Sequence, residues 1–226
     1  MRVAYYYGQS RLPPHDAAAN PYGPLLAAAL ERRGVDIEFT LDFDEHFLWE
    51  NRERIDILHL NWPHFFYYDD DPAIMERQLA AFIGCLELAR ELGYKVVWTA
   101  HNLYPHNRRH VTLDHQGRVA ICQLATAIIA HCAAAAGAVK QTFGCTDRLF
   151  IIPHGHFVDV YPGTLSRARA RERLGVPVDD FAYGFFGSLQ PYKGIEALFD
   201  ALACLDQDDA WLLISGGGKD PVYLDS

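Results

Sequence analysis

Short apolar runs alternate along the chain with longer stretches of helical periodicity. Most of these runs are apolar throughout rather than alternating, which is typical of parallel strands covered on both faces. The predicted strands are RVAYYY (2–7), VDIEFT (35–40), IDILHL (55–60), YKVVWTA (94–100), TAIIAHC (126–132) and RLFIIP (148–153). The pattern therefore predicts a parallel sheet enclosed between helices.

Helices are predicted between several of these runs. The stretches 21–34 and 71–93 each have a proline near the first turn and a glycine at the end. Proline is favoured at the start of a helix and glycine directly after its last turn. Residues 119–139 are long enough for a membrane span, but they are mainly alanine and contain Gln123, Thr126 and His131. This composition favours a buried helix followed by a short strand. Repeated strand–helix–strand units indicate a doubly wound α/β fold.

A second α/β pattern begins after IIPHGHFVDVYPG (151–163). We predict a first Rossmann-like domain over residues 1–163 and a helix and linker over the Arg-rich stretch 164–180. Residues 181–226 are predicted to start a second Rossmann-like domain, with strands at 181–187 and 211–215 around a helix at 193–205. Ligands of open α/β sheets bind outside the carboxyl ends of the strands, so the loops that follow the strands are the places for functional residues.

Composition and charge narrow the function. The 226 residues carry a net charge of -9, which argues against general binding to the nucleic-acid backbone because that needs a basic surface. The five cysteines are scattered and form no CxxC pair, so reduced thiols are expected rather than a disulfide framework or a zinc site. No signal peptide is evident at the N-terminus. A cytoplasmic protein is expected.

The loop that follows the fourth predicted strand, HNLYPHNRRH (101–110), is rich in histidine. A metal site is disfavoured, because Pro105 interrupts a helix and two arginines stand where a metalloprotease motif has its glutamate. An ordinary hydrogen-bonded loop is one alternative. The other is that His101 and Asn102, at the end of a central strand, face a substrate and exchange a proton or a hydrogen bond with it.

Two glycine-rich turns lie in the second unit. In GSLQPYKG (187–194), a strand ends at glycine and Lys193-Gly194 opens a helix, so that backbone N–H groups and an ammonium could bind an anion. An ordinary turn with an exposed lysine is an equal alternative. SGGGKD (215–220) lacks the spacing of a phosphate-binding loop and is interpreted as a plain turn.

Five segments together resemble a known family. NPYGPLLAAALERRG, DILHLNWP, KVVWTAHNLYPHN, IIPHGHF and FFGSLQPYKGIEALFDAL follow the order and spacing of family 4-like retaining glycosyltransferases of the GT-B fold. The resemblance is greatest to bacterial enzymes of polysaccharide or glycolipid biosynthesis. It implies two facing Rossmann-like domains, a nucleotide-sugar donor, a glycan or glycolipid acceptor, no metal or other cofactor, and in some cases a peripheral contact with the inner face of the membrane.

The resemblance also implies roles for particular residues. His101 would lie beside the transferred sugar as the catalytic residue, with Asn102 next to it. The turn after Gly8 and Asn20 would line the cleft on the acceptor side, and His154 would begin the interdomain connection. The diphosphate-binding turn would comprise Gly187, Ser188, Gln190 and Lys193.

The sequence departs from the family pattern in two places. The usual arginine of the diphosphate turn is Ser188, which removes a bidentate cationic contact. The carboxylate pair of the family's E-x7-E motif would lie beyond residue 226, so we expect a C-terminally truncated chain that transfers no sugar alone and self-associates through residues 181–226. Two alternatives remain: a sugar-nucleotide epimerase or phosphorylase of the same architecture, and a non-catalytic partner subunit.

One aromatic loop has two interpretations. NWPHFFYYDDD (61–71) places five aromatic side chains before a predicted helix. They suit stacking on an acceptor sugar or contact with a lipid interface. Packing beneath the helix is an equal alternative.

Overall fold

The computed structural model describes residues 1–7, 20–106, 108–158, 160–161, 163, 165–205 and 207–218. The chain divides into two compact units, Met1–Tyr161 and Pro162–Ser226. Unit 1 contains a six-stranded parallel sheet, and unit 2 contains a parallel pair of strands.

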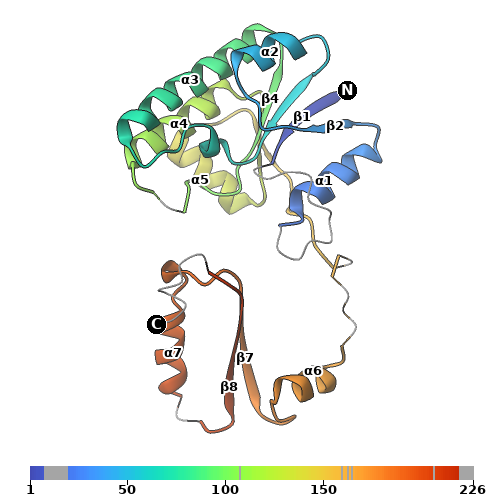
Figure 1. Ribbon diagram of the computed structural model, residues 1–226, viewed down its shortest axis with the longest axis vertical. Coiled ribbons are helices and arrows are strands. Elements are labelled where there is room, and N and C mark those ends of the chain that lie inside the picture. Colours follow the sequence, from blue (N-terminus) through green and yellow to red (C-terminus); the bar gives the residue numbers. More distant parts are fainter. Residues whose placement is uncertain are drawn as a thin grey trace. The chain divides into compact units, whose positions relative to one another are not determined.

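The sheet of unit 1 has the strand order β2-β1-β3-β4-β5-β6 (Figure 1). All neighbouring strands are parallel, as the continuous apolar runs predict. Its strands are β1 (Arg2–Tyr6), β2 (Asp36–Phe39), β3 (Ile57–Leu60), β4 (Lys95–Thr99), β5 (Ala127–Ala130) and β6 (Leu149–Ile151). The order of the strands reverses direction between β1 and β3, so this is the topological switch point where α/β proteins bind ligands.

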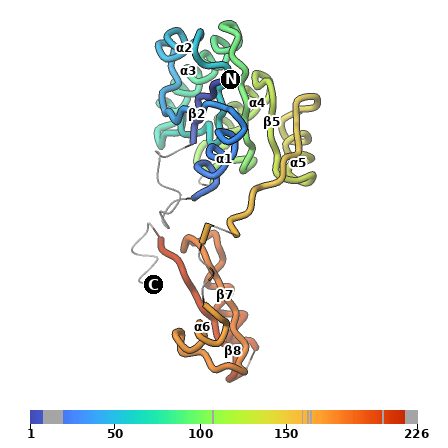
Figure 2. Tube along the Cα trace, turned by 90° about the vertical axis from the view of Figure 1, so that its right-hand side faces the viewer, coloured from blue at the N-terminus to red at the C-terminus, as the bar shows by residue number. Residues whose placement is uncertain are grey.

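Helices cover both faces of this sheet. They are α1 (Tyr22–Glu31), α2 (Glu45–Asn51), α3 (Pro72–Glu91), α4 (Val111–Leu124) and α5 (Ala133–Phe143). Right-handed crossovers place α1 on one face, and the reversal at the switch point places the later helices on the other. Figure 2 follows the chain from α1 in blue to α5 in yellow-green. The fold is therefore the doubly wound α/β class that the sequence predicts.

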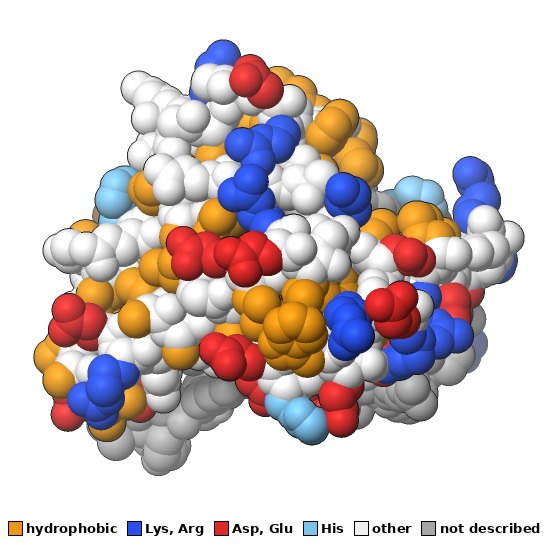
Figure 3. Space-filling model, turned by 90° about the horizontal axis from the view of Figure 1, so that it is seen from above, with side chains coloured by type: hydrophobic (Ala, Val, Ile, Leu, Met, Phe, Trp, Pro, Cys, Tyr) orange, Lys and Arg blue, Asp and Glu red, His pale blue; other side chains and the backbone are white. Residues whose placement is uncertain are grey.

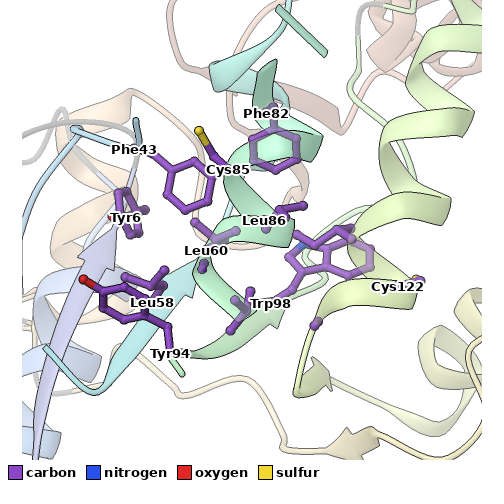
Figure 4. Packing of buried hydrophobic residues seen from close by; sticks show 14 of the residues in the cluster. Tyr6, Phe43, Leu58, Leu60, Phe82, Cys85, Leu86, Tyr94, Trp98 and Cys122 are labelled. Atoms are coloured by element: carbon purple, nitrogen blue, oxygen red, sulfur yellow. The ribbon is translucent and has the colours of Figure 1, made fainter. Parts of the chain in front are cut away.

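Alternation along the strands builds a core on each face. In β1, Ala4 and Tyr6 belong to the larger cluster, whereas Val3 and Tyr5 belong to the smaller cluster beneath α1. The larger cluster surrounds the fully buried Trp98 and includes side chains from β3, α2, α3, α4 and α5. Figure 4 shows Trp98 with members of the cluster from β3, α3 and α4. Because both faces carry large buried side chains, unit 1 has a hydrophobic core of its own.

Local sequence signals set several helix ends. Asp44 accepts a hydrogen bond from the Phe47 N–H at 2.8 Å and begins α2. Asp71 accepts one from the Ala73 N–H at 2.8 Å and begins α3 with Pro72 in the first turn. At the end of α5, Gly144 has a φ of 75°, a conformation that glycine adopts without steric cost.

Unit 2 contains α6 (Arg167–Leu174), β7 (Phe181–Phe186), α7 (Ile195–Ala203) and β8 (Ala210–Ser215). β7 and β8 pair in parallel over six residues. The Ser166 hydroxyl accepts a hydrogen bond from the Arg169 N–H at 3.3 Å and begins α6, which ends at Gly175. The helix is thus shorter than the stretch 164–180 in which it was expected.

Residues 119–139 are part of two helices and a strand. α4 ends at Leu124, β5 follows, and α5 starts at Ala133. The buried helix and short strand were therefore predicted, but α5 and the earlier helix α2 were not. Among the described residues, no helix has both the length and the apolar character needed to cross a membrane.

The expectation of reduced cysteines is wrong for one pair. Cys122 on α4 and Cys145 after α5 form a disulfide, while Cys85, Cys132 and Cys204 are free. The two bonded residues are 23 positions apart, and the packing of α4 against α5 brings them together. Their pairing depends on that packing, so the spacing of the cysteines in the sequence did not indicate it.

Candidate functional site

Three polar side chains meet at the carboxyl edge of the sheet in unit 1. Asn61 directly follows β3, His101 follows the end of β4 at Thr99, and His131 directly follows β5. These strands are neighbours in the sheet. Because parallel strands end at the same edge, residues separated by 30 or 40 positions come within hydrogen-bonding distance.

The three side chains form a chain of hydrogen bonds. The Asn61 side-chain N–H donates to the Tyr6 carbonyl oxygen at 3.0 Å, which turns the amide oxygen of Asn61 toward His101. His101 Nε2 lies 2.9 Å from that oxygen. His101 Nδ1 lies 3.4 Å from His131 Nε2, and His131 Nδ1 lies 3.0 Å from the Ile152 carbonyl oxygen. The backbone of β1 and the segment after β6 thus hold His101 from both sides.

Aromatic rings enclose His101. The Trp62 ring stacks on it, with ring centroids 4.8 Å apart and planes 23° apart. Tyr22, the first residue of α1, meets His101 edge-on at 4.8 Å. Tyr22 also contacts His131 at 5.5 Å and His154 at 4.7 Å. These rings remove water from around the imidazole while leaving it partly exposed.

Burial changes the acid–base behaviour of His101. Desolvation by burial, with a smaller contribution from charge repulsion by the neighbouring His131, His154 and His59, lowers its pKa to about 3. The cationic form of a buried imidazole loses the solvation that water would give it. At neutral pH His101 is therefore a neutral ring that can donate one hydrogen bond and accept another.

The loop that carries His101 is tied to α4. Arg118 is buried on α4 and donates from Nε to the Leu103 carbonyl oxygen at 3.1 Å. Its guanidinium also lies over the Trp98 ring, 5.5 Å from the centroid. The position of the loop 101–106 thus depends on a cation that packs in the core.

A second histidine, His59, lies beneath the site in β3. It is 5% exposed, and its Nε2 lies 2.8 Å from the Thr99 hydroxyl oxygen. Burial lowers its pKa to about 4. A histidine with a lowered folded-state pKa stabilises the fold above the unfolded-state pKa of about 6.5, and this stability is lost as the pH falls toward the folded-state value.

We therefore expect His59 to make unit 1 sensitive to acid. Between pH 7 and pH 5, this one residue should remove about 2 kcal/mol from the free energy of unfolding. In His59→Gln, which cannot take up the proton, that part of the pH dependence should disappear. Urea denaturation at both pH values measures it. An unchanged pH dependence in the variant would assign the acid sensitivity to other groups.

An apolar cavity of about 760 Å³ lies between α1 and the sheet of unit 1. Its wall includes Val3, Ile57, Val97 and Ile129 from four neighbouring strands. Tyr22 belongs both to this wall and to the ring cluster around His101. An apolar space therefore adjoins the histidine site.

The remaining predicted residues of the first unit differ in position. His154 lies in the cluster, with its ring 5.0 Å from that of His131. Asn20 accepts a hydrogen bond from the Tyr22 N–H at 3.1 Å and so supports the start of α1. Asn102 is exposed, and Gly8 lies outside the described residues. Among these residues, His154 is the one that contacts the rings around His101.

Two other histidines, one at the end of the loop and one on α4, make separate contacts. His110 Nε2 lies 2.9 Å from the Asp70 carbonyl oxygen, and His115 Nδ1 lies 2.9 Å from the Tyr104 hydroxyl oxygen. In the part of the chain that the structure describes, no group of three or more His, Cys, Asp or Glu side chains is arranged to hold a metal ion.

The side chains of the aromatic loop 61–71 are divided between the core and the candidate site. Phe66 and Tyr67 pack into the larger core cluster, with Tyr67 fully buried. Trp62 instead stacks on His101, and Phe65 is 61% exposed. Packing therefore explains part of the loop, and Trp62 belongs to the candidate site.

In unit 2, the two glycine-rich turns lie against each other. The Gly187 N–H donates to the Ser215 carbonyl oxygen and the Leu189 N–H to that of Gly217, both at 3.0 Å. A Cβ atom at Gly216 would lie 1.7 Å from the Gly187 oxygen, so this position requires glycine. Nothing in the sequence indicated that these two turns contact each other.

The predicted diphosphate turn has the expected local structure. Ser188 and Lys193 are exposed, and the Gln190 amide N–H lies 3.5 Å from the Ser188 hydroxyl oxygen. Gly194, with a φ of 69°, directly precedes α7. Lys193 therefore lies two residues before a nine-residue helix, whose N-terminus is a favourable place for an anion, and its ammonium lies over the Tyr192 ring, 5.2 Å from the centroid.

Trp62 was predicted from the sequence as part of the aromatic loop, but three members of the site were not predicted: Asn61, His131 and Tyr22. Each except Tyr22 directly follows or lies near the end of a strand, so the strand-end rule contained a signal for them. Which of these residues contact one another depends on the order of the strands in the sheet.

A doubly wound parallel sheet of this kind defines a Rossmann-like domain. Residues 77–160 of this domain match the model of Glycosyltransferase Family 4. The D-inositol 3-phosphate glycosyltransferases of Corynebacterium glutamicum (strain R) and Corynebacterium efficiens are each 36% identical over 81 residues. This match covers 33% of the chain and 19% of each relative.

Solved structures extend the likeness across both units. The Anabaena protein HepE in complex with UDP and glucose has a TM-score of 0.62 at 19% identity, and the match covers 100% of the chain and 64% of HepE. The Staphylococcus aureus MnaA–UDP structure has a TM-score of 0.55 at 12% identity, and the match covers 64% of MnaA. The chain thus spans less than two thirds of these solved structures. The resemblance to family 4 glycosyltransferases is thus confirmed over residues 77–160, and the likeness in fold to the solved structures covers both units.

Proposed function

We propose that the protein acts in sugar transfer from a nucleotide-sugar donor to a glycan or glycolipid acceptor, with retention of the anomeric configuration. The observation that carries the proposal is the position of His101. It lies at the carboxyl edge of the sheet near the switch point, within the segment that matches the glycosyltransferase family. His101 in this proposal contacts the reacting sugar, as the resemblance implies.

The surroundings of His101 support a hydrogen-bonding role. A neutral imidazole held between Asn61 and His131 can exchange one of these two hydrogen bonds for one to a polar group of the reacting sugar. Trp62, which is partly exposed beside His101, provides an aromatic ring that a sugar can contact. The apolar cavity beside Tyr22 suits the hydrocarbon part of a glycolipid acceptor.

The donor side of the proposal rests on unit 2. Gly187, Ser188, Gln190 and Lys193 would bind the diphosphate through backbone N–H groups and one ammonium. The structures of HepE and MnaA contain UDP, so UDP is the first probe to use. No metal or other cofactor is part of the proposal.

We expect Lys193→Ala to weaken UDP binding by roughly 1.5–3 kcal/mol, because a charge-assisted hydrogen bond to the diphosphate is lost. Isothermal titration calorimetry on wild type and variant measures the difference. Lys140→Ala, which removes a lysine from the last turn of α5 in unit 1, is the matched control. Equal affinities of wild type and Lys193→Ala would remove this lysine from the donor site.

Product analysis tests the reaction itself. The full-length gene product should convert a nucleotide sugar to free nucleotide diphosphate only when an acceptor is present. Conversion of the nucleotide sugar to an isomer without an acceptor would instead show an epimerase of the same architecture. Nucleotide binding without any conversion would favour a non-catalytic partner subunit.

On the face shown in Figure 3, acidic and basic side chains are interspersed among the described residues, without a continuous basic area. Together with the net charge of -9, this supports small-molecule and glycan partners over nucleic acid. We propose a cytoplasmic protein, in contact with the inner face of the membrane if its acceptor is a glycolipid.

A further inference from the structure

The hydrogen-bond chain through His101 and His131 fixes the positions of protons. The Asn61 amide oxygen can only accept, so the 2.9 Å contact requires a proton on His101 Nε2. The Ile152 carbonyl oxygen can only accept, so the 3.0 Å contact requires a proton on His131 Nδ1. The orientation of Asn61 is itself determined, because its N–H group donates to the Tyr6 carbonyl oxygen.

The remaining contact, between His101 Nδ1 and His131 Nε2 at 3.4 Å, is a hydrogen bond only when a third proton lies on one of these two nitrogens. Two neutral imidazoles carry only one N–H proton each. Without the third proton, two nitrogen lone pairs would face each other, or one outer hydrogen bond would be lost. The pair therefore satisfies all its contacts when it holds one proton more than two neutral rings.

The neighbours determine which ring holds that proton. His154 and His59 are the further titratable groups whose charges act on His101, and Tyr22 contacts both rings edge-on. Burial strongly disfavours a cationic His101. His131, whose Nδ1 donates to the Ile152 carbonyl oxygen, is then the ring whose Nε2 can donate to His101 Nδ1.

We propose that His101 and His131 form one proton-sharing pair, in which His131 is a positioning residue that carries the additional proton and fixes the tautomer of His101. The pairing is a property of unit 1 in the absence of substrate. Its consequence for catalysis rests on the proposed function: a neutral His101 with a protonated Nε2 is held in place beside a cation at the carboxyl edge of the sheet.

Nuclear magnetic resonance of the ¹⁵N-histidine-labelled protein tests the pairing without any substrate. Imidazole nitrogen shifts identify each protonated nitrogen. We expect His101 in the Nε2-protonated form, and we expect the resonances of both rings to shift with one common midpoint as a single proton is taken up. Separate midpoints, with each ring taking up its own proton, would overturn the proposal.

Two variants distinguish positioning from simple packing. A glutamine at position 131 can still donate to His101 Nδ1 but cannot take up the proton, so His131→Gln should retain the His101 tautomer and abolish the shared titration. His115→Gln, which alters a histidine paired with Tyr104, should leave both unchanged. An unaltered titration of His101 in His131→Gln would refute the pair.

Activity measurements separate this proposal from the proposed function. If sugar transfer is found, His131→Gln should remove a limb of the pH–rate profile that His115→Gln retains. If no sugar transfer is found but the common midpoint is observed, the pairing stands and only the proposed function fails.

Discussion

Replacement of His101 by alanine is expected to lower sugar transfer by the full-length gene product on the order of 10²-fold or more. The imidazole is held between Asn61 and His131 and is stacked on Trp62, so its loss removes a preorganised hydrogen-bonding group from the site. Steady-state kinetics with a nucleotide sugar and acceptor measure the effect. The decrease should appear in turnover rather than in donor affinity.

His115→Ala is the matched control for this substitution. His115 also makes a hydrogen bond through a ring nitrogen and lies on α4 in the same unit. Circular dichroism and thermal unfolding should show that both variants are folded. Wild-type turnover in a folded His101→Ala protein would exclude His101 from the mechanism.

The second large effect concerns association through unit 2, which we expect to pair with a second copy of the chain. Phe186 on β7 and Phe199 on α7 are 89% and 53% exposed, and β7 and β8 form a two-stranded sheet. Burying each phenylalanine contributes about 1.5–3 kcal/mol. Phe186→Glu with Phe199→Glu should therefore lower the association constant by roughly two orders of magnitude or more.

Sedimentation velocity over a range of protein concentrations measures this association. Phe65→Glu, at a position in unit 1 that is 61% exposed, is the matched control and should not alter it. A wild-type protein that stays monomeric at all concentrations would show that the apolar side chains of unit 2 do not pair. A loss of association in Phe65→Glu as well would place the interface elsewhere.

The sequence by itself determined the class of fold. β1 and β4 are unbroken apolar runs, and capped helices such as α3 lie between such runs. Few folds other than a parallel sheet covered on both faces are compatible with this pattern. The strand-end rule also selected His101 correctly as a residue of the carboxyl edge. These inferences succeed because they depend on local periodicity and on general rules of connection.

Tertiary structure decided which residues meet. The order β1-β3-β4-β5 brings Asn61, His101 and His131 into one hydrogen-bond chain, and the start of α1 adds Tyr22. The same packing pairs Cys122 with Cys145, against the expectation of reduced thiols. A periodic pattern specifies the face of an element but not its neighbour, because the neighbour is set by contacts between distant segments. The proton shared by two histidines is therefore a property of the folded sheet, and neither histidine would reveal it alone.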